Sequence, residues 1–344
     1  MTKTITADLK EQYESLKAAN PRLRIRNAAN ELNVSEAQLV ALSIGEGTIL
    51  LKPAFQDILK EIIHLGKVMG LTRNDSVVHE RKGVYDNISF EGPIGLAVNP
   101  DIDLRLFMMH WKYAFAVSEG DRNSIQFFDK SGEATHKIYL TSESDAVAYA
   151  KLIEKFKAED QCEELAFEAY PADAKELPDV EIDVTAFQQG WKNLKDTHEF
   201  FGLTRSHKLS RTQALRLAPK DFVLQVANDT ARKILQLAAE RQVPIMVFVG
   251  NRGCIQIHSG TVEKLLEAGP WYNVLDSMFN LHLNEPAISS SFIVKKPGVD
   301  GIITSVEIFD EKGEMIVQFF GARKPGIPEL ETWRSLVHDL ATVK

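Results

Sequence analysis

An internal repeat is the feature that most constrains the fold of this chain. Three segments of the first half recur in the same order in the second half. FFDKSGEATHKIYL (127–140) matches IFDEKGEMIVQFF (308–320), DLRLFMMHWKYAFAV (103–117) matches NLHLNEPAISSSFIV (280–294), and ELNVSEAQLVAL (31–42) matches SHKLSRTQALRL (206–217). The second member follows the first by 181, 177 and 175 positions. Nearly constant offsets are typical of a tandem duplication with small insertions, so we expect two similar folded halves.

Each half has the same coarse pattern: helical segments, then strand runs, then a closing helix. The strand runs are β-branched or alternating stretches, namely SVVH, YAFAV, SIQFF, IMVFV, GCIQIH, SFIV, ITSVEIF and IVQFF. DKSG and DEKG have turn chemistry and predict hairpins. SESDAVAYAKLIEKF and PELETWRSLVHDL are the predicted closing helices. Helices grouped before strands indicate an α+β fold with antiparallel sheets.

The acidic stretch AYPADAKELPDVEIDV separates the two halves and is the predicted linker. We therefore place a first repeat at residues 1–168, the linker at 169–184 and a second repeat at 185–344. The length of 344 residues agrees with a division into two domains.

The overall charge limits the classes of ligand. The net charge of −8 argues against a general polyanion-binding protein, because nucleic-acid-binding modules are usually basic. An anionic ligand must therefore be met by a local cluster of cations.

The cysteines and the N-terminus indicate the compartment. Cys162 and Cys254 are too few and too far apart for a disulfide framework or a cysteine zinc site, and we interpret both as inert thiols in a reducing compartment. MTKTITADLKEQYESL has no apolar signal segment, and runs such as VPIMVFVG are too short to span a bilayer. We expect a cytoplasmic protein without membrane insertion.

Both halves contain a predicted two-helix corner with a capping box. Ser35 with Gln38, and Ser210 with Gln213, fit the S-x-x-Q pattern before an apolar run. The first corner resembles a helix–turn–helix, which makes DNA binding a minor alternative. Its second helix begins with Ser35 and Glu36, however, and a carboxylate there repels phosphate.

His198 lies within a predicted amphipathic helix. Large apolar residues recur at helical spacing at Phe187, Trp191, Leu194 and Phe201. His198 continues this stripe, four residues after Leu194. A satisfied core histidine is one interpretation, and a ligand-binding imidazole is the other.

Comparison of the halves favours a binding site in the second half. At the offset of 175, His198 corresponds to Leu23 and Arg211 corresponds to Glu36, so the scaffold does not need an imidazole or a guanidinium there. Other candidate polar residues could form a cationic rim for an acidic ligand. These are Lys295 and Lys296 in SFIVKKPG, Gln318, Arg323 and Lys324 in VQFFGARKPG, and Arg105, whose companion is His282.

These segments together resemble the haemin-degrading and haemin-transport proteins of Gram-negative bacteria. The likeness rests on DTHEFFGL, LSRTQALRL, DIDLRLF, VPIMVFVGNRGCIQIHSG, VKKPGVDGIITSVEIFD and VQFFGARKPGIPEL, and it covers essentially the whole chain. The resemblance implies a duplicated fold, with haem (iron protoporphyrin IX) bound as substrate or cargo in a cleft between the halves.

The resemblance also implies roles for individual residues. His198 matches the proximal iron ligand, Arg105 the distal arginine that acts in catalysis, and Phe107 an apolar wall. The implied contacts to the haem propionates are Arg211, Lys296, Gln318 and Arg323. Many relatives have tyrosine where this chain has Phe320, and glutamine where it has Ala322. The loss of one hydrogen bond to a propionate is worth only about 1 kcal/mol, so we expect haem binding to survive.

The implied function is oxidative haem degradation that releases iron after haem uptake. The chain has no dinucleotide-binding glycine fingerprint, so we expect an external reductant or reductase, with an inner-membrane haem transporter as the source of haem. The alternative is a non-enzymatic carrier or storage protein that delivers haem to a separate oxygenase.

Overall fold

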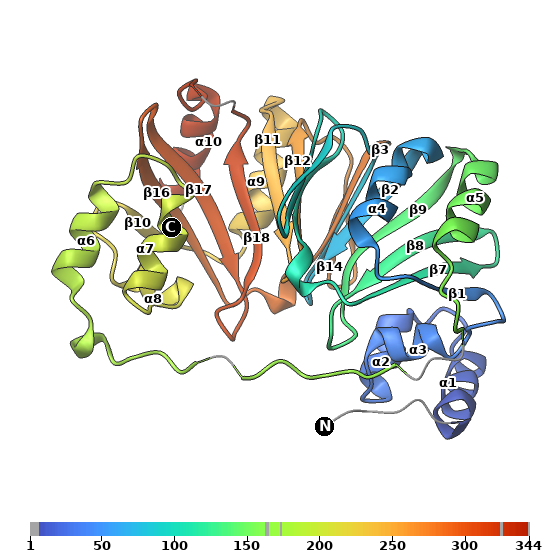
Figure 1. Cartoon of the computed structure of the whole chain (residues 1–344). Coiled ribbons are helices and arrows are strands. Elements are labelled where there is room, and N and C mark those ends of the chain that lie inside the picture. Colours follow the sequence, from blue (N-terminus) through green and yellow to red (C-terminus); the bar gives the residue numbers. More distant parts are fainter. Residues whose placement is uncertain (1–6, 162–164, 173, 324–325, 343–344) are drawn as a thin grey trace. The chain divides into compact units, whose positions relative to one another are not determined.

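The computed structural model describes residues 7–161, 165–172, 174–323 and 326–342 (Figure 1). Cys162 and Lys324 lie outside the described residues. The chain forms two compact units. The first comprises residues 1–73, 80–171 and 251–256, and the second comprises 74–79, 172–250 and 257–344. The change from one unit to the other at Pro171 falls within the predicted linker range, while the ranges 1–168, 169–184 and 185–344 stay predictions.

The first repeat runs through helices, strands and a closing helix, as its sequence predicts. Its helices are α1 (Ala7–Ala19), α2 (Ile25–Glu31), α3 (Glu36–Ala41), α4 (Phe55–Glu61) and α5 (Ala146–Phe156). Its strands are β1 (Thr48–Leu51), β2 (Gly66–Arg73), β3 (Val77–Val84), β4 (Ile88–Glu91), β5 (Ile94–Val98), β6 (Asp103–Phe107), β7 (Tyr113–Glu119), β8 (Arg122–Phe128) and β9 (Ala134–Ser144). The strand order is β1-β7-β8-β9-β2-β3, and β6-β5-β4 form a second group.

The second repeat has the same order of elements. Its helices are α6 (Val184–Lys192), α7 (Glu199–Ser206), α8 (Arg211–Arg216), α9 (Thr230–Arg241) and α10 (Glu331–Thr342). Its strands are β10 (Val223–Val226), β11 (Ile245–Gly250), β12 (Cys254–Gly260), β13 (Leu265–Ala268), β14 (Trp271–Leu275), β15 (Phe279–Asn284), β16 (Ser290–Gly298), β17 (Gly301–Phe309) and β18 (Met315–Gly321). The strand order β10-β16-β17-β18-β11-β12, with β15-β14-β13, repeats that of the first. The predicted α+β duplication with antiparallel sheets is therefore confirmed.

The two predicted hairpin turns use the same chemistry. Asp129 accepts hydrogen bonds from the backbone N–H groups of Ser131 and Glu133, and Asp310 accepts them from those of Lys312 and Glu314. Glycine ends each turn with a positive φ, 86° at Gly132 and 79° at Gly313. These turns connect β8 to β9 and β17 to β18, and they set the register of the strands that carry Glu307 and Gln318.

Helices α6 to α8 pack on strands β16 and β17 of the second unit. The buried contacts come from Phe187, Trp191, Leu194, Phe200, Leu209, Ala214, Leu215, Val294 and Phe309. The Trp191 indole donates a 3.0 Å hydrogen bond to the carbonyl of Lys295, which fixes α6 to β16. This layer holds the segment that contains His198 against the sheet.

Candidate functional site

The segment around His198 is not one continuous helix, so that prediction was wrong. Helix α6 ends at Lys192, and α7 begins at Glu199 with His198 as its N-cap residue. Side chains satisfy the backbone of the break: Asp196 accepts from His198 N (2.7 Å), and Glu199 accepts from Lys195 N (2.8 Å). Such local bonds compete with helical ones. Because of the break, α7 does not continue the apolar face of α6. Phe200 of α7 is buried, and Phe201 is 72% exposed.

His198 presents its imidazole to solvent, because its side chain is 90% exposed. Its Nδ1 lies 2.5 Å from Oδ1 of Asp196. A carboxylate only accepts hydrogen bonds, so in the neutral imidazole Nδ1 carries the proton and Nε2 carries the lone pair. The interpretation of His198 as a core histidine is therefore wrong, and the imidazole has the tautomer of a metal ligand.

Asp196 is a candidate site residue that the sequence does not single out, although it lies two positions before His198. The backbone N–H of His198 is the main cause that lowers the pKa of its carboxyl, and the charge of Arg323 lowers it further. Arg323 also pairs with Asp300 at 3.6 Å. Val299 N donates to the carbonyl of Lys195 (3.0 Å), so the loop before α7 rests on the β16–β17 turn. These contacts place the predicted propionate residue Arg323 near His198.

A buried ion cluster brings together three other predicted site residues. Glu307 on β17 accepts hydrogen bonds from Nε (2.9 Å) and Nη2 (2.6 Å) of Arg211, and from Nζ of Lys296 (2.8 Å). Gln318 on β18 lies directly opposite Glu307 in the strand register. The sequence identified the cations but not the acid that joins them, because Glu307 lies within the strand run ITSVEIF.

The cluster places charge in the protein interior. Burial alone would raise the pKa of the Glu307 carboxyl, but the charges of Arg211 and Lys296 hold it well below its ordinary value. Burial lowers the pKa of Lys296 to about 8, against the opposing effect of Glu307. The side chains of Glu307 and Lys296 are 0% and 4% exposed, whereas that of Arg211 is 28% exposed. Arg211 is thus the cation of the cluster with accessible surface.

The capped start of α8 differs from its prediction. The first capping box, Ser35 with Gln38, is confirmed in both directions. In the second, the Ser210 side chain accepts from Gln213 N, but the Gln213 amide donates to the Leu177 carbonyl and to Asp179. The predicted linker therefore competes for the glutamine, and Arg216 adds an ion pair to Asp179 at 2.8 Å.

Arg105 and Phe107 lie on strand β6 of the first unit. In the strand register Arg105 is opposite Leu96, and Phe107 is opposite Ile94, so these four side chains share one face of β5 and β6. Arg105 pairs with Asp103 and donates to the carbonyl of Leu104 (3.2 Å). Ile94 and Leu96 are each 37% exposed. This accessible apolar face was not predicted from the sequence.

Three further residues, Phe320, Cys254 and His207, have defined surroundings in the structure. Phe320 packs its ring against Phe248, with 4.9 Å between the ring centroids. Cys254 is confirmed as a buried thiol, and burial raises its pKa to about 12. His207 is half-buried, with its Nδ1 3.0 Å from the Leu203 carbonyl. His207 therefore contacts the backbone of its own helix, whereas the His198 imidazole contacts Asp196 and is largely exposed.

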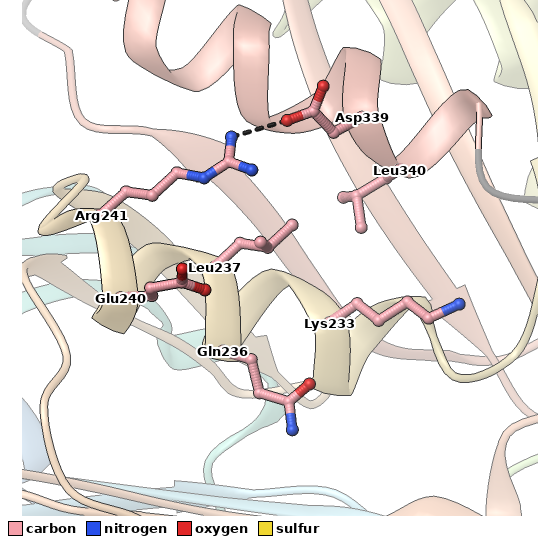
Figure 2. A pocket seen from close by; sticks show the side chains of 7 residues that line it. All are labelled: Lys233, Gln236, Leu237, Glu240, Arg241, Asp339 and Leu340. Atoms are coloured by element: carbon pink, nitrogen blue, oxygen red, sulfur yellow. Dashed lines mark ion pairs between the residues drawn. The ribbon is translucent and has the colours of Figure 1, made fainter.

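A surface groove lies elsewhere, between helices α9 and α10 of the second unit (Figure 2). Its walls are largely charged, and Arg241 and Asp339 pair across it at 2.7 Å. It contains none of the predicted haem-site residues. In the described part of the chain, no group of three or more His, Cys, Asp or Glu residues is arranged to hold a metal ion. None of the described helices is long and apolar enough to cross a membrane.

Known proteins are similar to this chain over nearly its whole length. The family model of the "Haemin-degrading HemS.ChuX domain" matches residues 33–156 and 208–340. The chain is 37% identical to the hemin transport protein HmuS of Yersinia pestis over 338 residues, which is 97% of each chain. It is 39% identical to the hemin transport protein HemS of Yersinia enterocolitica over 329 residues, which is 94% of each chain.

Two solved structures are similar over nearly the full length. The apo structure of PhuS, a heme-binding protein from Pseudomonas aeruginosa, has a TM-score of 0.95 and 46% identity, and the match covers 97% of this chain and 98% of that one. The heme degrading enzyme ChuS of Escherichia coli O157:H7 has a TM-score of 0.91 and 34% identity, with coverage of 97% and 98%.

Proposed function

The chain belongs to the haemin-degrading HemS/ChuX family, and from that premise we propose that it binds haem with His198 as the protein ligand to iron. The observation that carries the proposal is the imidazole at the start of α7. It is 90% exposed, and its Nδ1 is held by Asp196. A neutral imidazole whose second ring nitrogen donates to a carboxylate is a typical ligand for haem iron.

The surroundings of His198 fit a porphyrin with two propionates. Phe201, three residues further along, supplies an exposed aromatic surface for the macrocycle. Arg211, Lys296, Gln318 and Arg323 are the proposed carboxylate-binding side chains. Cationic N–H groups donate strong hydrogen bonds to a carboxylate, which allows a protein of net charge −8 to hold an anionic ligand.

We propose that Arg105 and Phe107 of the first unit also act on bound haem. The guanidinium offers N–H groups that could donate hydrogen bonds near bound haem. Phe107, with the exposed side chains of Ile94 and Leu96, offers an apolar wall. Bound haem would supply the redox chemistry, and the protein would supply orientation and electrostatics.

We propose oxidative ring opening that releases iron, with electrons from an external reductant or reductase. The proposed location is the cytoplasm, with an inner-membrane transporter as the source of haem. Delivery of haem to a separate oxygenase is the second candidate function. The 34% identity to the heme degrading enzyme ChuS supports ring opening, and the 46% identity to PhuS, described as heme-binding, fits both candidates.

DNA binding is not part of the proposal. Glu36 at the start of α3 is buried with Arg73 and Lys137, both of which pair with its carboxylate. A helix that begins with a carboxylate is poorly suited to approach phosphate.

The test is a titration with ferric haem, followed by addition of a reductant under air with and without catalase. Stoichiometric binding with a Soret band is expected, followed by loss of that band and a defined tetrapyrrole product in both conditions. Loss that catalase abolishes would identify free peroxide as the agent and leave the carrier function. Absence of stoichiometric binding would overturn both functions.

A further inference from the structure

Glu307 is a fully buried acid that contacts two of the proposed carboxylate-binding cations. Its Oε2 accepts from Nε of Arg211, and its Oε1 accepts from Nη2 of Arg211 and from Nζ of Lys296. Ser305 donates a further hydrogen bond of 2.9 Å to Oε1. The acid thus has four donors around it, and the cluster of two cations and one anion keeps a net positive charge.

The same cluster contacts the helix that presents His198. The guanidinium carbon of Arg211 lies 4.5 Å from the ring centroid of Phe200, and Nζ of Lys296 lies 5.0 Å from it. Phe200 is 1% exposed and lies two residues after His198, in the first turn of α7. Glu307 therefore holds two cations that pack on the mount of the proposed iron ligand.

Comparison of the two halves shows whether the fold itself requires an acid at the position of Glu307. At the offset of 181, Glu307 corresponds to Gln126 and Ser305 corresponds to Ser124. Gln126 is also buried, and its amide donates to Ser124 at 3.0 Å. The fold therefore accepts an amide at this position. The carboxylate occurs in the half that carries Arg211 and Lys296.

We propose that Glu307 is a positioning residue for recognition of the haem carboxylates, an inference that rests on the proposed function. The Glu307 carboxylate accepts hydrogen bonds from Nε and Nη2 of Arg211. Nη1 of Arg211 is then the nitrogen that donates to a ligand carboxylate. Lys296, which is 4% exposed, acts through Glu307. Preorganised donors bind more tightly, because less side-chain freedom is lost on binding.

The experiment compares the dissociation constants of ferric haem and of its dimethyl ester, which lacks free carboxylates. In the wild-type chain haem is expected to bind more tightly than the diester. Glu307→Gln should weaken haem binding about tenfold, the scale of a lost hydrogen bond to a charged group, and change diester binding by less than about twofold. The matched control is Glu329→Gln, because Glu329 is a buried acid of the same unit that accepts from Thr304 N.

Each outcome decides a different point. If Glu307→Gln leaves the affinities for haem and for the diester unchanged, the positioning role is overturned. It is also overturned if haem then binds more tightly relative to the diester, which would make Glu307 a repulsive group. Equal weakening for both ligands would reduce Glu307 to a structural residue. Failure of the wild-type chain to bind haem would instead overturn the proposed function.

A second variant covers the case in which Glu307→Gln does not fold because Lys296 is left as an unpaired buried cation. The double variant Glu307→Gln with Lys296→Met removes that charge together with its partner. It should fold, as measured by circular dichroism, and show at least the tenfold loss of haem affinity, with diester binding again changed by less than about twofold. A wild-type ratio in the double variant would overturn the inference.

Discussion

Each unit has a buried ion cluster at the start of an equivalent helix. The charge that the helix contributes to the cluster is negative in the first unit and positive in the second. In the first unit the helix α3 supplies the acid, Glu36, and the sheet supplies Arg73 and Lys137. In the second unit the helix α8 supplies the cation, Arg211, and the sheet supplies Glu307 with Lys296. The duplicated fold therefore needs a polar contact between this helix and the sheet, and either sign satisfies it.

The accessibility of the two helix residues shows what the inversion changes. Glu36 is 1% exposed, so the first cluster is closed. The side chain of Arg211 is 28% exposed, so the second cluster offers a guanidinium to a ligand. In the first unit the helix–sheet ion cluster has a structural role. We propose that the cluster of the second unit also takes part in ligand recognition.

The largest predicted effect concerns His136, whose counterpart in the second unit is Val317. His136 is buried between Tyr85 and Thr72, with hydrogen bonds of 2.7 and 2.8 Å, and burial lowers its pKa to about 3. The unfolded chain binds the proton more readily, so stability is full above pH 6.5 and falls as the pH drops toward 3. The loss should reach about 5 kcal/mol.

Urea unfolding at several pH values measures this loss. His136→Gln keeps hydrogen-bonding capacity and should flatten the pH dependence of the unfolding free energy between pH 6 and 4. An equal slope in both proteins would exclude His136 as its source.

The closed cluster gives the next largest effect. Glu36→Ala leaves Arg73 and Lys137 buried without their acid, and should cost about 3–4 kcal/mol of unfolding free energy. Chemical denaturation measures the change. Glu46→Ala is the control, because Glu46 is 67% exposed in its pair with Lys10 and a solvent-screened surface pair should contribute far less. Similar values for the two variants would show that the first cluster contributes little stability.

Arg105→His places in the first unit the residue that the second unit has at the equivalent position, His282. Haem affinity should stay within about threefold, whereas haem turnover should fall by roughly 10- to 100-fold, because a fixed cationic donor is lost. Single-turnover spectra with reductant measure the rate. Undiminished turnover would remove Arg105 from the proposed mechanism.

The smallest predicted effect is a gain. Phe320→Tyr restores the residue at the equivalent position of the first unit, Tyr139. A new hydrogen bond to a propionate should strengthen haem binding by about 1 kcal/mol, or roughly fivefold. Binding of the dimethyl ester serves as the control. A gain that is equal for both ligands would assign the effect to packing against Phe248 instead.

The duplication, the strand runs and the hairpin turns were predictable from the sequence, because they depend on local periodicity and on turn residues such as Gly132 and Gly313. The break before α7 was not, because two side-chain caps from Asp196 and Glu199 outweigh an apolar spacing that fits one helix. The prediction of a reciprocal second capping box failed because the linker residue Asp179 binds Gln213.

The site was only partly predictable for a similar reason. Arg211 became a candidate because the first half has Glu36 at the equivalent position, and Lys296 because it belongs to the basic pair in SFIVKKPG. Their partner Glu307 was hidden, because a single acid in a strand has no sequence signal that distinguishes a buried position from an exposed one. Strand register is needed to place Glu307 opposite Gln318.

The most direct test of the central proposal is the optical spectrum and affinity of the ferric haem complex of His198→Ala. His207→Ala is the matched control, because His207 ends the same helix and contacts the Leu203 carbonyl. The proposal predicts a changed Soret band and at least about tenfold weaker binding for His198→Ala, with the wild-type spectrum for His207→Ala. A wild-type spectrum and affinity for His198→Ala would contradict the assignment of His198 as the iron ligand.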